Sequence, residues 1–258
     1  MYRTISVLAY GELVRNLVLK DLKLKYRDSV LGFLWSLANP LLLILVYGFV
    51  FTHMLRTDIP NFAYFLIVGI LPWNFFAQSL LMSTVSILEN GTLIRTVWLP
   101  LEVFPVATVL FNLAHYFLAL VVFLPVSAVF LQVRPAPSML AFFPLLALHV
   151  LFTLGLGFII CTATVFYRDV RHFTENLLMP LFWLTPIVYE IDTLPETLRA
   201  IIYLNPLSHF ILGYQDILYR RTLPDPTRLL TLLVVSTASF VAGYALFRRC
   251  KARFPEEV

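Results

Sequence analysis

Residues 21–51 read DLKLKYRDSVLGFLWSLANPLLLILVYGFVF, and this stretch decides the class of the fold. It is basic and amphipathic as far as Arg27, and an uncharged apolar run follows almost at once. The run is long enough to cross a bilayer, since about 20 helical residues cover the roughly 30 Å hydrocarbon core. The cations beside the run predict that this end of it lies in the cytoplasm. We therefore expect a membrane protein with a surface-lying cytoplasmic arm.

The composition of the whole chain supports a membrane protein. Of the 258 residues, 60% are hydrophobic and 13% are charged, whereas soluble domains contain roughly 25% charged residues. The mean hydropathy is +0.84. The net charge of +4 is explained by cationic flanks of membrane spans, so it does not indicate binding to nucleic acid.

Six apolar runs predict an all-α membrane protein with six transmembrane helices. The runs cover residues 31–54, 62–88, 102–131, 139–167, 173–189 and 227–247. With the N-terminus inside, 13 of the 19 Lys and Arg residues fall on the cytoplasmic side, and this excess predicts that both termini are cytoplasmic. We expect one membrane domain over residues 1–258, made of an arm (1–30), spans one to five (31–189), an external region (190–226), span six (227–247) and a tail (248–258).

The arm has the pattern of an amphipathic helix lying at the membrane surface. Its apolar half contains Leu13, Val14, Leu17, Val18, Leu22 and Leu24, and its polar half contains Glu12, Asn16, Lys20, Lys23 and Arg27. The pattern fits a simple membrane anchor and a docking element for a cytoplasmic partner equally well.

Residues 89–100, ENGTLIRTVWLP, form the predicted cytoplasmic loop between spans two and three. Asn90-Gly91 is a turn signal, and Thr92 is a candidate N-cap of a short helix that ends before Pro100. This helix would present Leu93, Ile94, Val97 and Trp98 at its surface. Apolar side chains at such a place indicate either a loop folded back on the membrane or a surface for a partner.

Residues 189–226 are too apolar for a solvated external loop, and prolines cut them into pieces too short to span a bilayer. The cuts fall at Leu194-Pro195 and at Asn205-Pro206, with Leu204 at the end of the first piece. Two short re-entrant helices fit best, and such segments are tolerated only where they are buried in protein or line a cavity. The region is therefore a candidate gate.

Motifs of enzyme chemistry are missing from the sequence. It contains no HExxH zinc motif, no GxGD motif and no GxxxxGK[ST] phosphate loop. His115 and His149 lie inside spans three and four, where ionisable groups are functional candidates, but neither has a carboxylate neighbour in sequence. We expect a packing role for both histidines, and no metal site or cofactor in this chain.

Aromatic side chains are the remaining functional candidates within the predicted spans. Interface belts enrich Trp and Tyr, so an anchoring role explains many of them. The functional alternative is a conduit of flat rings on which sugar rings slide. Its candidate residues are Phe33, Trp35, Tyr47, Phe51, Trp73, Phe75, Phe76, Phe182, Trp183 and Tyr189.

Four stretches resemble the permease subunit of ABC-2 transporters that export polysaccharides. They are residues 21–51, residues 69–80 (GILPWNFFAQSL), residues 166–173 (FYRDVRHF) and residues 184–207 (LTPIVYEIDTLPETLRAIIYLNPL). The resemblance covers nearly the whole chain and is weakest in residues 105–140 and after residue 224. It implies a six-helix subunit that pairs as a homodimer and binds two copies of a separate cytoplasmic ATPase, which binds ATP and Mg²⁺.

The resemblance also implies roles for particular segments. The arm resembles an interface helix that packs on the ATPase, with Arg15, Lys20 and Lys23 on its polar side. Residues 89–98 occupy the place of the coupling helix, namely Glu89, Asn90, Gly91, Thr92, Leu93, Ile94, Arg95, Val97 and Trp98. Residues 192–219 look like the re-entrant helices that close the external side. Spans one and five of opposite subunits would border a lateral opening for a lipid anchor.

The substrate implied by the resemblance is a polyprenyl-pyrophosphate-linked glycan such as O-antigen, moved across the bacterial inner membrane. Lys25 and Arg27 are the candidate cations where the pyrophosphate is admitted. The alternatives are an ABC-2 exporter of teichoic acid, capsule or another lipid or drug, a membrane enzyme acting on polyprenyl-linked sugars, and a non-catalytic scaffold. The sequence leaves open the glycan, its length, the type of host cell wall and whether the ATPase carries a sugar-binding domain.

Overall fold

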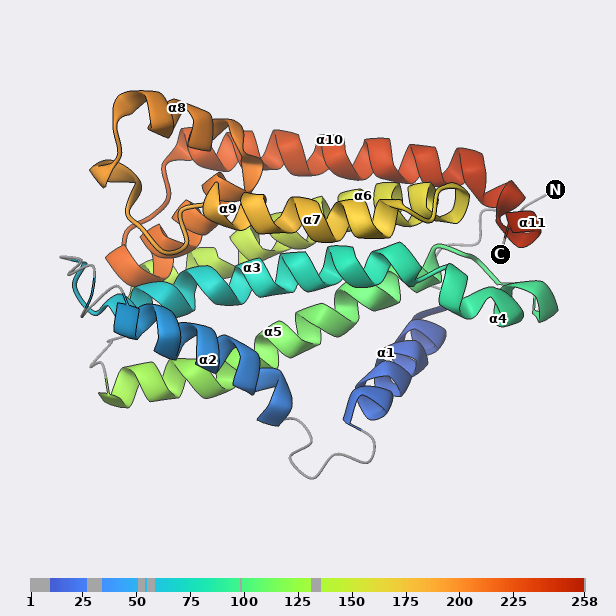
Figure 1. Ribbon diagram of the computed structural model, residues 1–258, viewed down its shortest axis with the longest axis horizontal. Coiled ribbons are helices and arrows are strands. Elements are labelled where there is room, and N and C mark those ends of the chain that lie inside the picture. Colours follow the sequence, from blue (N-terminus) through green and yellow to red (C-terminus); the bar gives the residue numbers. More distant parts are fainter. Residues whose placement is uncertain are drawn as a thin grey trace.

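The computed structural model describes residues 10–26, 34–50, 54, 59–97, 99–130 and 136–257, and the regular elements in these ranges are all helices (Figure 1). Four long helices run side by side through the molecule. They are α3 (Phe62–Val85), α5 (Val103–Phe130), α6 (Phe142–Phe166) and α10 (Pro226–Cys250). The predicted all-α class is confirmed.

Four helical stretches are long and apolar enough to cross a membrane. They are Phe62–Val85, Val103–Pro125, Pro137–Phe166 and Pro226–Glu257, where the last two include short flanking helices. These stretches correspond to the predicted second, third, fourth and sixth spans. The chain is therefore a multi-pass helical membrane protein.

The first and fifth predicted spans contain shorter helices. They are α2 (Leu34–Phe49), with 16 residues, and α7 (Val170–Trp183), with 14. At 1.5 Å per residue these helices are about 24 and 21 Å long, shorter than the roughly 30 Å hydrocarbon core. The six-span topology stays a prediction.

The end of α7 differs from the expected fifth span, which ran from residue 173 to residue 189. The helix begins earlier, at Val170, and ends at Trp183. Thr185 precedes Pro186, and the residue before a proline disfavours helical backbone. The chain turns there instead, with the Thr185 amide donating to the Phe182 carbonyl at 3.2 Å.

Two glycines allow α6 and α10 to form the most extensive helix pair of the bundle. A Cβ atom added at Gly155 would lie 2.4 Å from the backbone carbon of Ser239, and one added at Gly243 would lie 2.1 Å from the Gly155 oxygen. Small residues at a helix crossing let two backbones touch, which is the usual basis of helix packing in membranes.

The two ends of the bundle contain different short elements (Figure 1). One end has α8 (Glu196–Leu204), α9 (Pro206–Tyr214), the π-helical turn η6 (Gln215–Arg220) and the short helices η4 (Pro137–Ala141) and η5 (Ile191–Thr193). We call it the α8–α9 end. The opposite end, called the α4 end, has η3 (Leu88–Asn90), α4 (Gly91–Thr96), η7 (Lys251–Arg253) and α11 (Phe254–Glu257).

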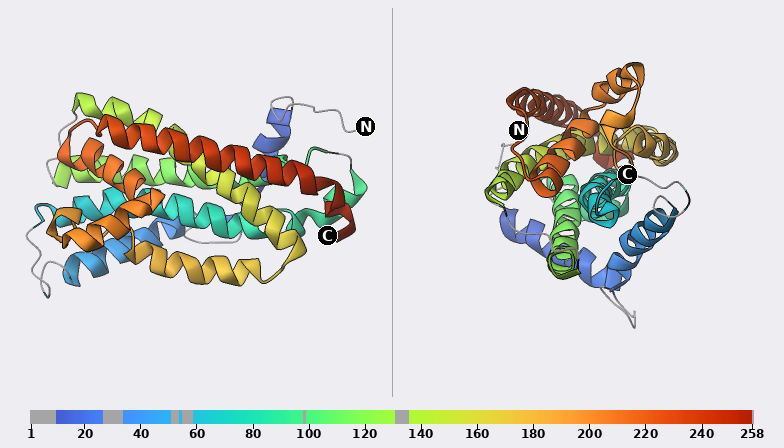
Figure 2. Two further views of the ribbon diagram at one scale, coloured as in Figure 1. Left: turned by 90° about the horizontal axis from the view of Figure 1, so that it is seen from above. Right: turned by 90° about the vertical axis from the view of Figure 1, so that its left-hand side faces the viewer.

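The remaining helix, α1 (Gly11–Tyr26), packs on α5 outside the long bundle. In the view along the bundle, α2 and α7 lie on the same side of α3 (Figure 2, right), and both contact it. The main apolar core fills the middle of the bundle, and a second apolar cluster lies at the α4 end, where it includes side chains of α1, α4, α6, α10 and α11.

Candidate functional site

Four of the predicted pathway aromatics meet where α2, α3 and α7 come together. Phe182 lies at the centre, with its ring centroid 6.0 Å from that of Tyr47, 5.5 Å from that of Trp73 and 5.5 Å from that of Trp183. Trp183 is 53% exposed, while Trp73 is buried. The cluster thus extends from the core to the outer face shared by α2 and α7.

The other predicted pathway aromatics lie beside this cluster, lie deeper in the core or lack a described side chain. Phe75 and Phe76 are buried in the core, where their rings contact His149. The Tyr189 hydroxyl donates to the Trp183 carbonyl at 2.9 Å. Phe33 and Phe51 are outside the described residues, and Trp35 lies in α2 with a side chain that is not described.

The two histidines of the spans contact neighbouring aromatic rings and backbone or hydroxyl groups. The fully buried His149 ring stacks on Phe210 of α9, with centroids 4.6 Å apart, and its Nδ1 atom is 3.3 Å from the Tyr214 hydroxyl. Its Nε2 atom has no hydrogen-bond partner among the described residues. His115 places its Nδ1 atom 3.1 Å from the Phe111 carbonyl in its own helix. His149 thereby joins α6 to α9.

The predicted breaks in the external region are confirmed. Pro195 immediately precedes α8, and Leu204 is its last residue. Asn205 caps α9, since its side-chain oxygen accepts from the Leu207 amide at 3.0 Å, and Pro206 is the first residue of the helix. The Asn205 amide also donates to the Thr185 hydroxyl at 3.0 Å, which ties the start of α9 to the turn after α7.

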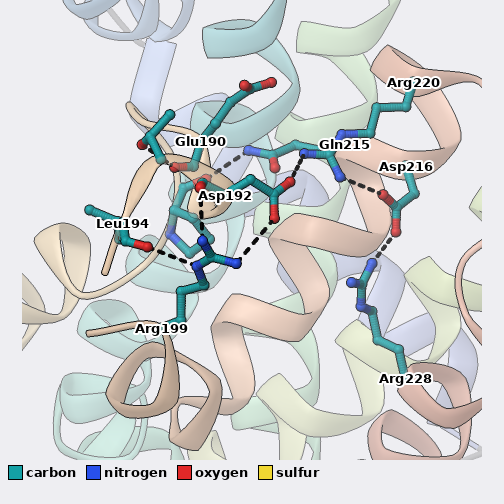
Figure 3. A network of polar contacts seen from close by, with 10 residues as sticks. Glu190, Asp192, Leu194, Arg199, Gln215, Asp216, Arg220 and Arg228 are labelled. Carbon is teal, nitrogen blue, oxygen red and sulfur yellow. Dashed lines mark hydrogen bonds and ion pairs between the residues drawn. The ribbon is translucent and has the colours of Figure 1, made fainter. Parts of the chain in front are cut away.

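A chain of five charged side chains joins α8, η5, η6 and α10 (Figure 3). Arg220 lies between two carboxylates, 3.6 Å from Asp192 and 3.4 Å from Asp216. Arg228 of α10 donates to the other carboxylate oxygen of Asp216, and Arg199 of α8 is 4.0 Å from Asp192. Asp216 is the most buried member, with 11% of its side chain exposed. The external region is therefore fixed to the start of α10 by ion pairs.

Burial raises the pKa of the Asp216 carboxyl above its ordinary value, and the charges of Arg228 and Arg220 act in the opposite direction. The ionised carboxylate thus depends on its two guanidinium partners. Two further contacts hold the same region. The Gln215 amide donates to the Pro186 carbonyl at 2.7 Å, and Arg199 Nε donates to the Leu194 carbonyl at 2.8 Å.

At the α4 end, the predicted short helix is present, but the predicted cap is wrong. The helix begins at Gly91, so Thr92 lies inside it. The Asn90 side chain does not cap the helix and donates instead to the Ser86 carbonyl at 2.9 Å. The helical turn η3 leads directly into α4. Thr92 therefore has helical backbone, whereas an N-cap residue has non-helical backbone.

The apolar side chains of α4 divide between the inside and the surface. Ile94 is buried in the apolar cluster of the α4 end and Leu93 packs against it, whereas Val97 is 50% exposed. Glu89 and Arg95 are also exposed. Trp98 is outside the described residues.

The arm has the predicted amphipathic character. Val14 and Leu17 of α1 are buried in the same cluster as Ile94. The cationic residues Arg15, Lys20 and Lys23 are exposed. The side chain of Lys25 is not described, and Arg27 is outside the described residues.

A pocket of about 460 Å³ lies between α1, the end of α3 and α5. Its mouth includes Lys20 and Asp21, and burial raises the pKa of Asp21 while Lys20 acts in the opposite direction. Gln78, Met82 and Val85 of α3 line one wall. Gln78 is exposed although it lies within a candidate membrane span. Polar side chains in a span generally face the protein interior or a water-filled cavity, so this pocket is a polar recess beside the arm.

The sequence of the chain matches the family described as ABC-2 type transporter over residues 12–219. The chain belongs to the ABC-2 type transporter family. It is a membrane transport protein of the kind that works with an ATPase partner. The alternatives of a membrane enzyme and of a scaffold are therefore wrong.

Similar proteins align over almost their whole length. The chain is 37% identical over 241 residues to the O-antigen export system permease protein RfbA of Klebsiella pneumoniae, covering 92% of this chain and 91% of that protein. It is 35% identical over 251 residues to the protein of the same name from Myxococcus xanthus, covering 96% of each chain. The polysialic acid transport protein KpsM of Escherichia coli is 22% identical over 247 residues, which are 91% of this chain and 92% of that protein.

Sequence reasoning about this ABC-2 permease missed the ion pairs and the polar recess. A spacing of four residues between Asp216 and Arg220 was the only local signal for the ion pairs. The sequence shows Gln78 as a polar residue inside an apolar run. Its place in a pocket lined by α1, α3 and α5 depends on how these helices pack. Among the described residues, no group of three or more His, Cys, Asp or Glu side chains could hold a metal ion.

Proposed function

We propose that this permease exports a polysaccharide linked to polyprenyl pyrophosphate, such as O-antigen, across the bacterial cytoplasmic membrane. The observation that carries the proposal is the alignment with two RfbA permeases at 35–37% identity over more than nine-tenths of the chain. The match to the probable multidrug permease YbhS of Escherichia coli covers only 52% of the chain and gives the drug alternative less support. Capsule and teichoic acid remain alternative cargoes.

The proposed assembly is a homodimer of six-span subunits with two copies of a cytoplasmic ATPase, and both termini of the permease are cytoplasmic. α2 and α7 would be the first and fifth spans and would border a lateral opening for the lipid. Both present large apolar side chains on the outside, which suits contact with a second copy and with lipid. The most exposed of them are Leu42, Leu45 and Phe49 on α2 and Phe173 and Met179 on α7.

The proposed ATPase contacts lie at the α4 end. Residues 89–98 would act as the coupling helix, because α4 is a short helix outside the long bundle with exposed side chains at Glu89, Arg95 and Val97. The exposed cations of α1 would contribute to the same surface. ATP and Mg²⁺ would be bound by the partner, and closure of its nucleotide sites would push on α4.

The proposed path of the glycan begins at the polar recess beside the arm. A pyrophosphate would be attracted by Lys25 and Arg27, the entry cations of the sequence prediction. Sugar rings would then pass over the cluster formed by Tyr47, Trp73, Phe182 and Trp183 by stacking on flat surfaces. At the far end the external region, with Leu194, Pro195, Leu204, Asn205 and Pro206 at its breaks, would act as the gate.

The proposed cargo is tested by depleting the permease in its host and extracting lipid-linked glycans. We expect one glycan to accumulate inside the cells and to disappear from the surface, and its chemistry identifies the cargo. An unchanged surface glycan without internal accumulation contradicts polysaccharide export.

The role of the recess is tested separately with Gln78→Leu and with charge reversal at Lys25 and Arg27. We expect reduced export with normal binding of the ATPase. Val121→Ala, at a 70% exposed site of α5 away from the recess, is the matched control and should export normally. Loss of ATPase binding in the charge-reversal variant would instead give those cations a structural role.

A further inference from the structure

The C-terminal segment, residues 251–257, is packed into the α4 end. The Phe254 side chain of this segment is fully buried. Its ring centroid is 5.3 Å from that of Phe247 on α10 and 6.1 Å from that of Phe166 at the end of α6. The same apolar cluster contains Ile94 of α4, and α11 contacts both α4 and α6.

An ion pair fixes the same segment from a second side. Lys251 Nζ is 2.6 Å from Glu102 Oε1, and only 5% of the Glu102 side chain is exposed. Glu102 directly precedes α5, and Lys251 directly follows α10. A carboxylate at a helix N-terminus and an ammonium at a helix C-terminus both interact favourably with the helix dipoles. The second carboxylate oxygen of Glu102 is buried without a partner among the described residues. The negative charge of Glu102 is therefore balanced mainly by Lys251.

Both contacts lie close to α4: Glu102 follows it in the chain, and Phe254 shares an apolar cluster with its residue Ile94. Glu102 belongs to the short connection between the end of α4 at Thr96 and the start of α5 at Val103. The ion pair therefore holds the start of α5, where the connection from α4 arrives, to the end of α10. Phe254 lies in the same apolar cluster as Ile94, next to side chains of α6 and α10. A displacement of α4 relative to α6 and α10 therefore shifts its contacts with α11 and acts on the connection that ends at Glu102.

We propose that the C-terminal segment is a coupling element, in which Lys251 and Phe254 are positioning residues that make α6 and α10 follow the movement of α4. This inference rests on the proposed function of α4 as the contact for the ATPase. The proposal gives a role in coupling to a segment for which the sequence alone predicted only a cytoplasmic location. Lys251 and Phe254 act through α4 and do not touch the transported substrate.

The test uses the full permease in complex with its ATPase, reconstituted in liposomes with the exported glycolipid. ATP hydrolysis and export are measured together for Lys251→Glu, Glu102→Lys and the double variant. Each single variant should reduce export per ATP by about fivefold or more, the lower end of typical coupling between sites. The double variant should recover part of the loss, because the pair is restored while the exchanged charges oppose the helix dipoles.

Arg249→Glu is the matched control, since it makes the same change of charge at an exposed site two residues away. It should keep the export per ATP of the wild type. Phe254→Ala should lower the ratio and Phe254→Leu should lower it less. Complex formation, followed by copurification of the ATPase, should remain in all variants, which separates coupling from folding.

Hydrogen exchange at the amides of α4 gives a readout that does not depend on transport. Lys251→Glu should increase exchange in α4, and the double variant should reduce it again. A wild-type ratio and wild-type exchange in both single variants overturn the coupling role, as does a double variant no better than the single ones. A wild-type complex that exports no glycan counts against the proposed function, and the exchange experiment then still decides whether the segment holds α4.

Discussion

At the α8–α9 end, Asp192, Asp216 and three arginines connect four elements through directional ion pairs. At the α4 end, side chains of α1, α4, α5, α6, α10 and α11 meet in an apolar cluster beside the Lys251–Glu102 ion pair. Ion pairs require particular atoms at particular distances, while apolar contact is non-directional. The first arrangement fixes the external region in one position relative to α10. The second places fewer directional constraints on α4 and α1. The comparison thus separates an end held mainly by ion pairs from an end held mainly by apolar packing.

The largest effect should come from Asp216→Ala, which tests how strongly the charges hold the α8–α9 end. The change leaves Arg228 and Arg220 without the carboxylate they share. Removing one partner of a buried ion pair costs about 3–5 kcal/mol of stability. Unfolding of the purified permease in detergent measures the loss.

Glu196→Ala, at an exposed position in the first turn of α8, is the control for this change and should unfold like the wild type. Replacing the pair by apolar side chains, with Asp216→Leu and Arg228→Met together, should recover most of the stability. Wild-type stability of Asp216→Ala would show that the ion pairs do not hold this end.

The corresponding change at the α4 end is Ile94→Ala. Because Ile94 is buried in the apolar cluster but lies in a short helix, we expect a loss of about 2 kcal/mol, near the lower end for such truncations. Hydrogen exchange should increase in α4 and remain unchanged in α8 and α9. Ile94→Val should have a smaller effect, and equal exchange at both ends would mean that the two ends are not independent.

A smaller effect is expected from Gly155→Ala, which tests the connection between the two ends along α6 and α10. The new methyl group meets the backbone of α10, so the two helices must separate, at a cost of about 1–2 kcal/mol. Gly48→Ala on α2 makes the same chemical change where nothing lies within 4 Å. It should be neutral or slightly stabilising, and thermal unfolding of the two variants side by side gives the comparison.

The smallest effect should come from Asp192→Asn. The Asp192 side chain is 66% exposed, and an exposed ion pair contributes at most about 1 kcal/mol. The effect should shrink further at high salt because exposed charges are screened. An effect as large as that of Asp216→Ala would show that the five charged residues act as one unit and not as a buried pair with an exposed extension.

The sequence predicted the helices best where local chemistry decides them. Pro195 precedes the start of α8, and Asn205-Pro206 marks its end and the start of α9, since proline and an N-cap act through the backbone next to them. The faces of α1 were also predictable, because an amphipathic helix at an interface separates its polar and apolar residues. The prediction of Thr92 as the N-cap of α4 was wrong, because η3 leads directly into a helix that begins at Gly91.

The candidate pathway shows where such prediction stops. Trp73 contacts Phe182 of the α2–α3–α7 cluster, while Phe75, two residues along the same helix, lies against His149. Phe76 contacts both groups, with its ring centroid 6.1 Å from those of Trp73 and His149. All three are aromatic residues in an apolar helix, and composition does not distinguish them. The described structure separates Trp73 from Phe75 because their side chains leave α3 in different directions.

By itself the sequence determined that this protein is a helical membrane permease with a cationic amphipathic arm and a region, residues 190–226, broken into short helices. Length, hydropathy and proline positions suffice for these features, because each acts through the solvent or the local backbone. Only the tertiary structure decided which aromatics meet, how Asp216 pairs with Arg228, and that Phe254 and Lys251 pack into the α4 end. A span in lipid is apolar on every side, so its sequence has no polar face to reveal which side contacts a neighbour.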